Sequence, residues 1–329
     1  MLILSREQVM SFLSVETCIQ ELERVFKMFA KGEALVSTTR IFRQFGEGNA
    51  WMYAIAGAVS PLNRSIVKAL PINWDNPRER KLPHMYGIIL LCEQTSGVPL
   101  SIMDATYITN LRTGVLAALG AKYLAKKNPE SLGVIGTGEI AKSATLALSA
   151  QFPNLKSIRV HSRSSTNRER FVDNVSRLVG APINASGSPE DATRGADIVV
   201  TATSARGPVL KASMVEEGMY VHSMGSRQEV EPSVLQRAKV VAEGKEECKT
   251  HGKWGEALKA GAVKEDALYA ELVEIIGGTK KGRTTDSETF FLDSVGLPIE
   301  DTILASRVYD DALRSGVGTN LELYDGLTE

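Results

Sequence analysis

The sequence predicts an α/β protein in which a doubly wound parallel sheet follows an α+β part. From about residue 131 onward, short apolar strands alternate with helical segments, which is typical of a parallel sheet with helices on both faces. From residue 35 to residue 92, short apolar runs alternate with turn residues, which indicates a mostly antiparallel sheet. At 329 residues, the chain is long enough for two domains.

Composition excludes several classes of partner. The formal net charge is −1, so neither nucleic acid nor an anionic membrane surface is an expected partner.

Cys18, Cys92 and Cys248 are odd in number and far apart, as expected for reduced thiols in a cytoplasmic protein. Cys248 and His251 lack a second pair of ligands nearby, so no metal site is predicted. The sequence begins without a signal-peptide pattern, and no apolar run is long enough for a membrane span.

Two helices and several strands are predicted before residue 104. Ser5 and Gln8 have the spacing of a capping box, which indicates a short helix. Apolar residues at helical spacing predict a second helix over residues 15–30, with Gly32 after its end. Strands are expected near residues 40–42, 51–55, 66–70, 86–92 and 100–103.

Three cations stand out in this first part of the chain. Arg40 and Lys68 each lie on a strand-like run among apolar neighbours, although a solvated strand face also carries such charges. Arg112 falls in the first turn of a helix predicted over residues 109–127. A cation there opposes the helix dipole, so an anionic partner for Arg112 is the favoured interpretation.

A dinucleotide-binding motif lies at the centre of the second part. Residues 132–135 form a predicted buried strand, followed by Gly136, Gly138 and Ala141 at the spacing G-x-G-x-x-A and then by a helix. The first glycine permits a tight turn, the second leaves room for a pyrophosphate, and the alanine allows close packing of helix on strand. The alternative is a glycine-rich turn that binds no ligand.

The remaining pattern completes a Rossmann-type domain. A polar, proline-containing link at residues 126–131 marks its start. Further strands are predicted at residues 157–161, 197–203, 219–224 and 239–242, with helices at 166–179, 188–195 and 232–238.

The end of the second strand indicates which cofactor is used. An acidic residue there would bind the 2′-hydroxyl of NAD, but the sequence has Ser162, Arg163 and Ser164. Arg163 can pair with a 2′-phosphate, and the serines can donate hydrogen bonds to it. NADP(H) is therefore favoured, and NAD(H) bound through the serines is the alternative.

Taken together, these residues resemble the ornithine cyclodeaminase/mu-crystallin family over most of the chain. The resemblance is carried by Arg40, Lys68 and the blocks at residues 103–114, 136–141, 201–203, 223–225 and 291–301. It implies a substrate-binding and dimerisation domain at residues 1–127, completed by 302–329. A Rossmann NAD(P)-binding domain at residues 128–301 is inserted between these segments. It also implies a homodimer.

The resemblance further implies roles for individual residues. Arg40 and Arg112 match positions that hold the α-carboxylate of an amino or imino acid, and Lys68 matches one beside its α-carbon or nitrogen. Lys68 and Arg112 are therefore the expected catalytic residues, with Lys68 as a proton donor of lowered pKa. The expected cofactor-binding positions are Thr113, Gly136, Thr137, Gly138, Glu139, Ile140, Thr203, Met224, Gly225 and Val295, together with Ser162, Arg163 and Ser164.

The implied activity is NAD(P)H-dependent hydride transfer to or from the α-carbon of an amino or imino acid. One departure bears on the alternatives. Cyclodeaminases of the family carry an Asp at a position that Arg227 occupies or adjoins in this chain, and Arg can neither accept a proton nor hold an ammonium. Arg227 instead suggests a substrate with an anionic or neutral far end, while Glu229 or Glu231 remains a possible substitute for the Asp. An ammonia-lyase of the ornithine cyclodeaminase type and a mu-crystallin-like binding protein remain the two rivals.

Overall fold

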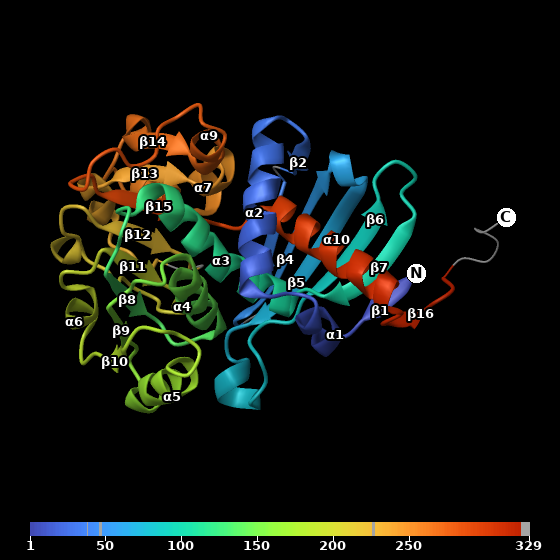
Figure 1. Cartoon of the computed structure of the whole chain (residues 1–329), viewed down its shortest axis with the longest axis horizontal. Helices are drawn as coiled ribbons and strands as arrows, with labels where there is room; N and C mark the ends of the chain where they lie inside the picture. Colours follow the sequence, from blue (N-terminus) through green and yellow to red (C-terminus); the bar gives the residue numbers. More distant parts are fainter. Residues whose placement is uncertain (38, 46–47, 226–227, 324–329) are drawn as a thin grey trace. The chain divides into compact units, whose positions relative to one another are not determined.

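The computed structural model describes residues 1–37, 39–45, 48–225 and 228–323. The chain forms two compact units: unit 1 comprises Met1–Arg112 and Leu297–Glu329, and unit 2 comprises Thr113–Gly296. The sequence places the domain boundaries at 127/128 and 301/302. The chain passes between the units earlier, inside α3 (Thr106–Leu124) and just before α10 (Pro298–Ser315), both labelled in Figure 1.

Unit 1 contains an eight-stranded sheet in the order β16-β1-β7-β6-β5-β4-β2, with β3 also paired to β4. Neighbouring strands are antiparallel except for β1 and β7, which are parallel. The expected antiparallel sheet is thus present, and its edges gain β1, β2 and β16, which the pattern did not predict. The strands are β1 (Leu2–Leu4), β2 (Ala34–Val36), β3 (Ile41–Gln44), β4 (Ala50–Val59), β5 (Arg64–Asn73), β6 (Ile88–Glu93), β7 (Pro99–Asp104) and β16 (Thr319–Asn320).

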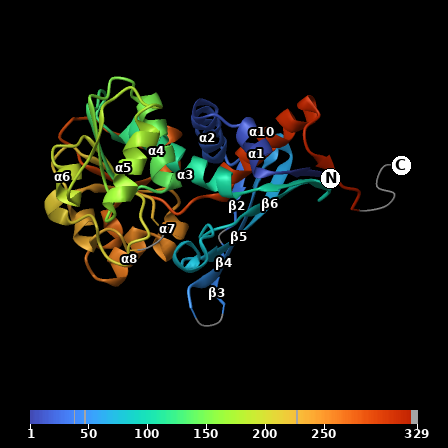
Figure 2. The same ribbon diagram turned by 90° about the horizontal axis from the view of Figure 1, so that it is seen from below.

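Helices cover one face of this sheet. Figure 2 shows α1 (Arg6–Ser11), α2 (Val15–Ala30) and α10 gathered on the same side. The predicted capping box is confirmed, because the Ser5 side chain accepts from the Gln8 amide and the Gln8 side chain accepts from the Ser5 amide. Burial alternates along β5, with Ile66, Lys68 and Leu70 buried and Val67 exposed. The sheet therefore has a covered face, which includes Lys68, and an open one.

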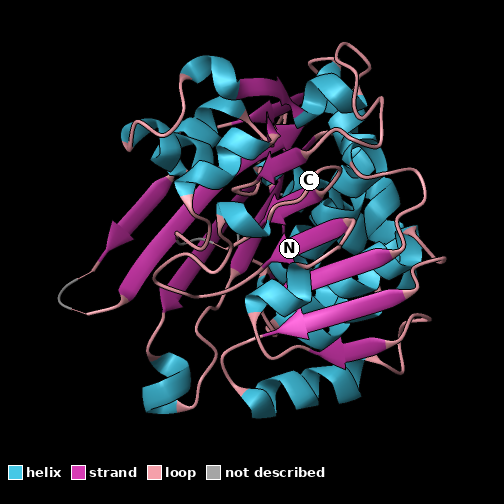
Figure 3. Cartoon of the chain, turned by 90° about the vertical axis from the view of Figure 1, so that its left-hand side faces the viewer, coloured by secondary structure: helices cyan, strands magenta, loops and turns pink. Residues whose placement is uncertain are grey.

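Unit 2 contains the predicted parallel sheet, whose strands appear in magenta in Figure 3. Its order is β10-β9-β8-β11-β12-β15-β13-β14, and every neighbouring pair is parallel. The strands are β8 (Ser131–Ile135), β9 (Ser157–His161), β10 (Ile183–Ala185), β11 (Ile198–Thr201), β12 (Tyr220–Ser223), β13 (Lys239–Ala242), β14 (Leu268–Glu271) and β15 (Phe290–Asp293). All four residues of β11, β12 and β15 are buried, as expected for strands with both faces covered.

Two details of unit 2 differ from the sequence pattern. The last strand, β15, lies between β12 and β13, a placement that needs a long-range crossover and leaves no local signal. The predicted helix at residues 232–238 is a 3₁₀ segment, Pro232–Arg237. The α-helices of unit 2 after α3 are α4 (Glu139–Gln151), α5 (Ser165–Val175), α6 (Pro189–Thr193), α7 (Lys245–His251), α8 (Lys253–Lys259) and α9 (Leu272–Ile276).

Candidate functional site

In unit 1, two of the predicted cations contact acids in the first turn of α10. The Lys68 ammonium lies 2.5 Å from Asp301 Oδ2, and both side chains are 0% exposed. Arg112 Nη1 lies 3.2 Å from Glu300 Oε2, and Arg112 Nε lies 3.8 Å from Asp301 Oδ1. Strand β5, helix α3 and helix α10 therefore meet in one buried cluster of two cations and two carboxylates, which we name the α10 cluster (Lys68, Arg112, Glu300 and Asp301).

The α10 cluster corrects two interpretations. Helix α3 begins at Thr106, three residues earlier than predicted, so Arg112 lies beyond the first turn and does not mark a helix-terminal anion site. The start of α3 is instead capped by Asp104, whose Oδ2 accepts the Tyr107 amide at 2.8 Å. Asp301 lies near the start of a helix, where an acid typically caps the helix, but here it is buried against Lys68. No local pattern separates a capping acid from one that pairs across the fold.

Burial sets the proton affinity of Lys68. Its neighbours across the sheet are Ile55 on β4 and Ile89 on β6, both buried. Burial lowers the pKa of Lys68 from 10.5 to about 8, because the charged form loses its hydration, while Asp301 opposes this by stabilising the charge. The predicted downward shift is therefore present, and it arises within unit 1.

Arg40 lies immediately before β3, and its Nη1 donates to the Tyr53 hydroxyl at 2.8 Å. Tyr53 is two residues from Ile55 on β4, so it is about 7 Å along the strand from the residue that pairs with Lys68, and on the same face. Tyr53 has no distinguishing feature in the sequence. It links the third predicted cation to the covered face of the sheet.

In unit 2, the glycine motif adopts the expected strand–turn–helix geometry. Gly136 has φ +128°, and a Cβ there would lie 2.2 Å from the Ala202 carbonyl oxygen. Gly138 is the N-cap of α4, and a Cβ there would meet nothing within 4 Å. The first glycine is thus required by the fold, whereas the second leaves open space at a helix N-terminus that no side chain caps. Such a cradle suits the phosphates of a dinucleotide.

The other predicted cofactor positions lie along the same edge of the sheet. The glycine loop, Ser162, Thr203, Met224 and Val295 follow the carboxyl ends of β8, β9, β11, β12 and β15 in turn. These five strands are consecutive in the order β9-β8-β11-β12-β15 and span about 19 Å at the usual strand spacing. The order of the strands reverses direction at β8, which is where open α/β sheets bind ligands.

Three further predicted positions belong to helices α3 and α4. Glu139 and Ile140 begin α4, with Glu139 exposed and Ile140 half-buried. Thr113 is buried in α3, beside Gly114, where a Cβ would lie 2.4 Å from the Ala144 amide nitrogen of α4. Thr113 is therefore next to the close packing of α3 on the helix that follows the glycine loop.

A buried carboxylate joins two of these loops. Glu229 is 0% exposed and accepts five hydrogen bonds. Its Oε1 accepts from Thr201 Oγ1 at 2.7 Å, Ser223 Oγ at 3.0 Å and the Gly225 amide at 2.7 Å, and its Oε2 accepts from the amide and hydroxyl of Thr203, both at 2.8 Å. Glu229 therefore holds the loops after β11 and β12 from the inside.

This bonding excludes Glu229 as the substitute for the cyclodeaminase Asp, because its carboxylate is turned into the core and fully engaged. The Glu231 carboxylate accepts the Ala212 amide at 2.9 Å. Arg227 lies outside the described residues. A second carboxylate, Glu243, accepts the amides of Val295 and Gly296, each at 2.7 Å, and so fixes the loop after β15 in the same way.

The loop after β9 is also ordered by its own polar groups. Ser164 caps α5 by accepting the Asn167 amide at 3.2 Å, and Ser162 Oγ donates to the Ser164 carbonyl at 3.2 Å. Arg163 is exposed. A pocket of about 260 Å³ lies beside this loop and the glycine motif, lined by Thr137, Gly138, Glu139, Lys142, Asn167, Arg170, Phe171, Asn174 and Val175.

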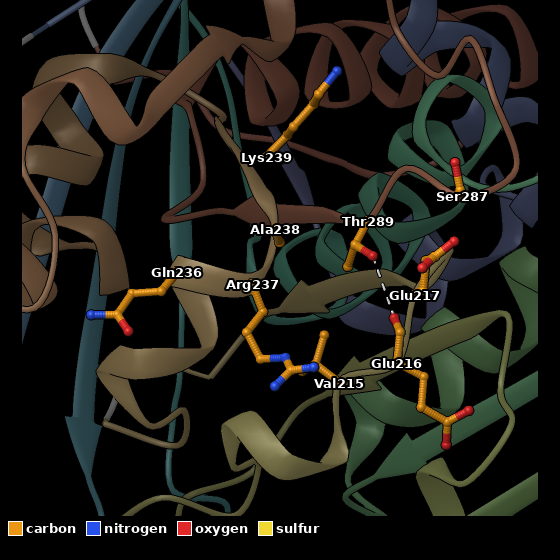
Figure 4. A pocket seen from close by; sticks show the side chains of 9 residues that line it. All are labelled: Val215, Glu216, Glu217, Gln236, Arg237, Ala238, Lys239, Ser287 and Thr289. Carbon is orange, nitrogen blue, oxygen red and sulfur yellow. Dashed lines mark hydrogen bonds between the residues drawn. The ribbon is translucent and has the colours of Figure 1, made fainter.

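A second hollow of about 700 Å³ lies at the opposite, amino-terminal edge of the same sheet (Figure 4). Its lining residues lie at or before the starts of β12, β13 and β15, for example Glu217, Lys239 and Thr289. Thr289 Oγ1 donates to the Glu216 carbonyl at 3.3 Å. This hollow is therefore separate from the edge that carries the predicted cofactor positions.

Neither a group of metal ligands nor a membrane-spanning helix occurs among residues 1–37, 39–45, 48–225 and 228–323. Among those residues, no group of three or more His, Cys, Asp or Glu side chains is arranged to hold a metal ion. Within the same residues, no helix has the length and apolarity to cross a bilayer.

The parallel sheet and its loops define a Rossmann-type nucleotide-binding protein with a second, α+β unit. Residues 1–316 match the model of the ornithine cyclodeaminase/mu-crystallin family. The chain belongs to this family, as the sequence blocks predicted.

Its relatives include a dehydrogenase and a reductase. Alanine dehydrogenase of Archaeoglobus fulgidus is 32% identical over 332 residues, which is 98% of each chain. The structure of Δ1-pyrroline-2-carboxylate reductase of Thermococcus litoralis, in complex with NADH and L-proline, has a TM-score of 0.93 at 31% identity and covers 98% of this chain and 100% of that one. An archaeal alanine dehydrogenase dimer with bound NAD has a TM-score of 0.91 at 30% identity, covering 98% of this chain and 99% of that one.

Proposed function

We propose that the protein reduces the C=N bond of a small imino acid, or performs the reverse oxidation of an amino acid, at a site built on the α10 cluster. The protein is a nicotinamide-dependent oxidoreductase of amino or imino acids. The observation that carries the specific proposal is that Lys68 and Arg112 are both buried and both pair with acids in the first turn of α10. Relatives that act on alanine and on Δ1-pyrroline-2-carboxylate support this substrate class.

Each cation has a chemical task in this proposal. Arg112 and Arg40 bind the substrate α-carboxylate, for which a guanidinium offers paired donors in a fixed plane. Lys68 Nζ gives a proton to the substrate nitrogen in reduction and takes it back in oxidation. A pKa of about 8 suits both directions, since both protonation states are populated near neutral pH. Nicotinamide, when bound, supplies or accepts the hydride.

Unit 2 is the proposed cofactor-binding unit. The uncapped N-terminus of α4 and the open space at Gly138 fit a pyrophosphate, and the loops after β11, β12 and β15 carry Thr203, Met224, Gly225 and Val295. Neither of these features requires a particular nicotinamide dinucleotide.

We favour NADP(H) within this proposal. Arg163 is exposed beside the α5 N-terminus, and Lys142 and Arg170 line the adjoining pocket, so a 2′-phosphate would meet positive charge. The Arg163→Ser variant should weaken NADPH binding about ten- to a hundredfold, as expected for one lost charge-assisted hydrogen bond, and leave NADH binding unchanged. Fluorescence titrations with both cofactors measure this. Tighter binding of NADH than NADPH by the unaltered protein would refute the preference.

The proposed assembly is a homodimer formed by the open face of the unit 1 sheet. Leu35, Ile41, Val67 and Ile88 are 50–56% exposed, and their ladder partners place them all on the face opposite Lys68. A contiguous apolar face of this kind is typical of an interface between copies. The archaeal alanine dehydrogenase relative, which is a dimer, supports this proposal.

The central test is a panel of cyclic imino acids and of 2-oxo acids with ammonia, assayed with NADH and NADPH. We expect loss of absorbance at the nicotinamide band with at least one imino or oxo acid. The Lys68→Met variant should bind cofactor normally but turn over about 10²- to 10⁴-fold more slowly, since it lacks the proton donor. Ammonia release from ornithine without net change in that absorbance would instead identify a cyclodeaminase. Cofactor binding with no turnover across the panel would favour a binding protein.

A further inference from the structure

The first turn of α10 provides one acid for each of the two cations of the α10 cluster. Glu300 and Asp301 are consecutive, both are 0% exposed, and they pair with Arg112 and Lys68 respectively. Asp301 also approaches Arg112, with 3.8 Å between Oδ1 and Nε. Asp301 is therefore the residue of α10 that touches both cations.

The groups that stabilise the positive charge of Lys68 come from helix α10. Its cross-strand neighbours Ile55 and Ile89 are apolar and buried, so these two residues provide no compensating charge. The charged groups that act on Lys68 are Asp301 and Glu300 from α10, which favour the ammonium, and Arg112 from α3, which disfavours it.

We infer that Asp301 is a positioning residue that holds the Lys68 ammonium in place and keeps it protonated over the working pH range of the enzyme. The inference rests on the proposed role of Lys68 as proton donor. It assigns to Asp301 a role that acts entirely through Lys68, without contact with the substrate.

The physical reason is the balance of two opposing effects. Burial penalises the ammonium, and Asp301 is the largest influence in the opposite direction. An opposite charge at this distance shifts a pKa by about 1–3 units. Without the charge of Asp301, a shift of that size would leave half or more of the Lys68 side chains neutral at pH 7 and so without a proton to give.

Asp301→Asn removes this charge and keeps the size of the side chain. We expect the falling, alkaline limb of kcat for imine reduction to move about 1–3 pH units lower, with little change in KM for NADH. The probe is Δ1-pyrroline-2-carboxylate with NADH, or whichever imino acid of the panel turns over fastest. Asp301→Glu restores the charge and should return the limb toward that of the unaltered enzyme, although with lower kcat.

Glu300→Gln is the matched control, because it lies in the same turn and is equally buried but pairs with Arg112. It should raise KM for the imino acid and move the alkaline limb less than Asp301→Asn does. Equal shifts in the two variants, or a uniform fall in rate with no shift for Asp301→Asn, would overturn the inference and leave Asp301 a structural residue.

A second measurement separates this inference from the proposed function. Because the folded pKa of Lys68 is about 8 and its ordinary value is 10.5, the unfolded chain binds more protons in that window, so stability rises with pH between them. In Asp301→Asn the rise should begin about 1–3 pH units lower, and in Lys68→Met it should be absent. Urea unfolding from pH 5 to pH 11 measures this without any substrate. An unchanged profile in Asp301→Asn refutes the inference, whereas a shifted profile in a protein that reduces no imino acid refutes only the proposed function.

Discussion

Replacement of Glu229 by Gln tests how the cofactor loops are held. The two backbone donors on Glu229 lie on different oxygens, since Oε1 accepts the Gly225 amide and Oε2 accepts the Thr203 amide. The hydroxyls of Thr201, Ser223 and Thr203 can rotate to accept, but a backbone N–H cannot. An amide side chain has one acceptor and one donor end, so it can serve only one of these two N–H groups.

The expected loss of stability follows from the number of backbone N–H groups that Gln cannot serve. One buried N–H is left without an acceptor, at about 1–3 kcal/mol, and the remaining bonds lose the benefit of a charged acceptor. We expect the free energy of unfolding to fall by about 2–4 kcal/mol, and the melting temperature of a unit of this size to fall by about 4–15 °C. Binding of NADH or NADPH should also weaken, because Thr203 and Gly225 lie in the proposed cofactor site.

Urea unfolding followed by circular dichroism measures the first effect, and cofactor fluorescence measures the second. Glu231→Gln is the control, because the Glu231 carboxylate accepts one amide, that of Ala212, which a Gln oxygen also satisfies. If Glu229→Gln unfolds at the same urea concentration as the unaltered protein and as Glu231→Gln, the argument that this carboxylate braces the loops is wrong.

Three further predictions follow from the geometry. Gly136→Ala should destabilise the protein severely, because φ is +128° and the new Cβ would collide with the Ala202 carbonyl oxygen. Gly138→Ala should have an unchanged melting temperature but bind cofactor more weakly. Calorimetry measures the first effect, and cofactor titration measures the second. Burial lowers the pKa of His222 from 6.5 to about 3, so the unfolded chain binds more protons between these values and stability should fall as pH drops from 6.5 toward 3. The slope of urea stability against pH should flatten in His222→Gln, and an equally steep slope would contradict this. Val67→Lys, on the open sheet face, should convert a dimer into a folded monomer by sedimentation; a persistent dimer would place the interface elsewhere.

Much of the protein was determined by local sequence pattern. The glycine motif, the alternation of strands and helices and the capping box at Ser5 each depend on residues close together in the chain, and each was predicted correctly. The positions Thr203, Met224 and Val295 could be identified as family matches without knowledge of their neighbours. Because these residues follow parallel strands, they lie at the same edge of the sheet whatever the order of the strands.

The tertiary structure alone decided which charges pair. Lys68 and Asp301 are separated by 233 residues, and Glu229, a possible substrate-site acid by sequence, accepts five hydrogen bonds inside the fold. A charged residue has the same local pattern whether it caps a helix, faces water or is buried beside a partner. The difference is desolvation, which depends on packing between distant segments, and that is why the acids of α10 and the insertion of β15 could not be predicted from the sequence.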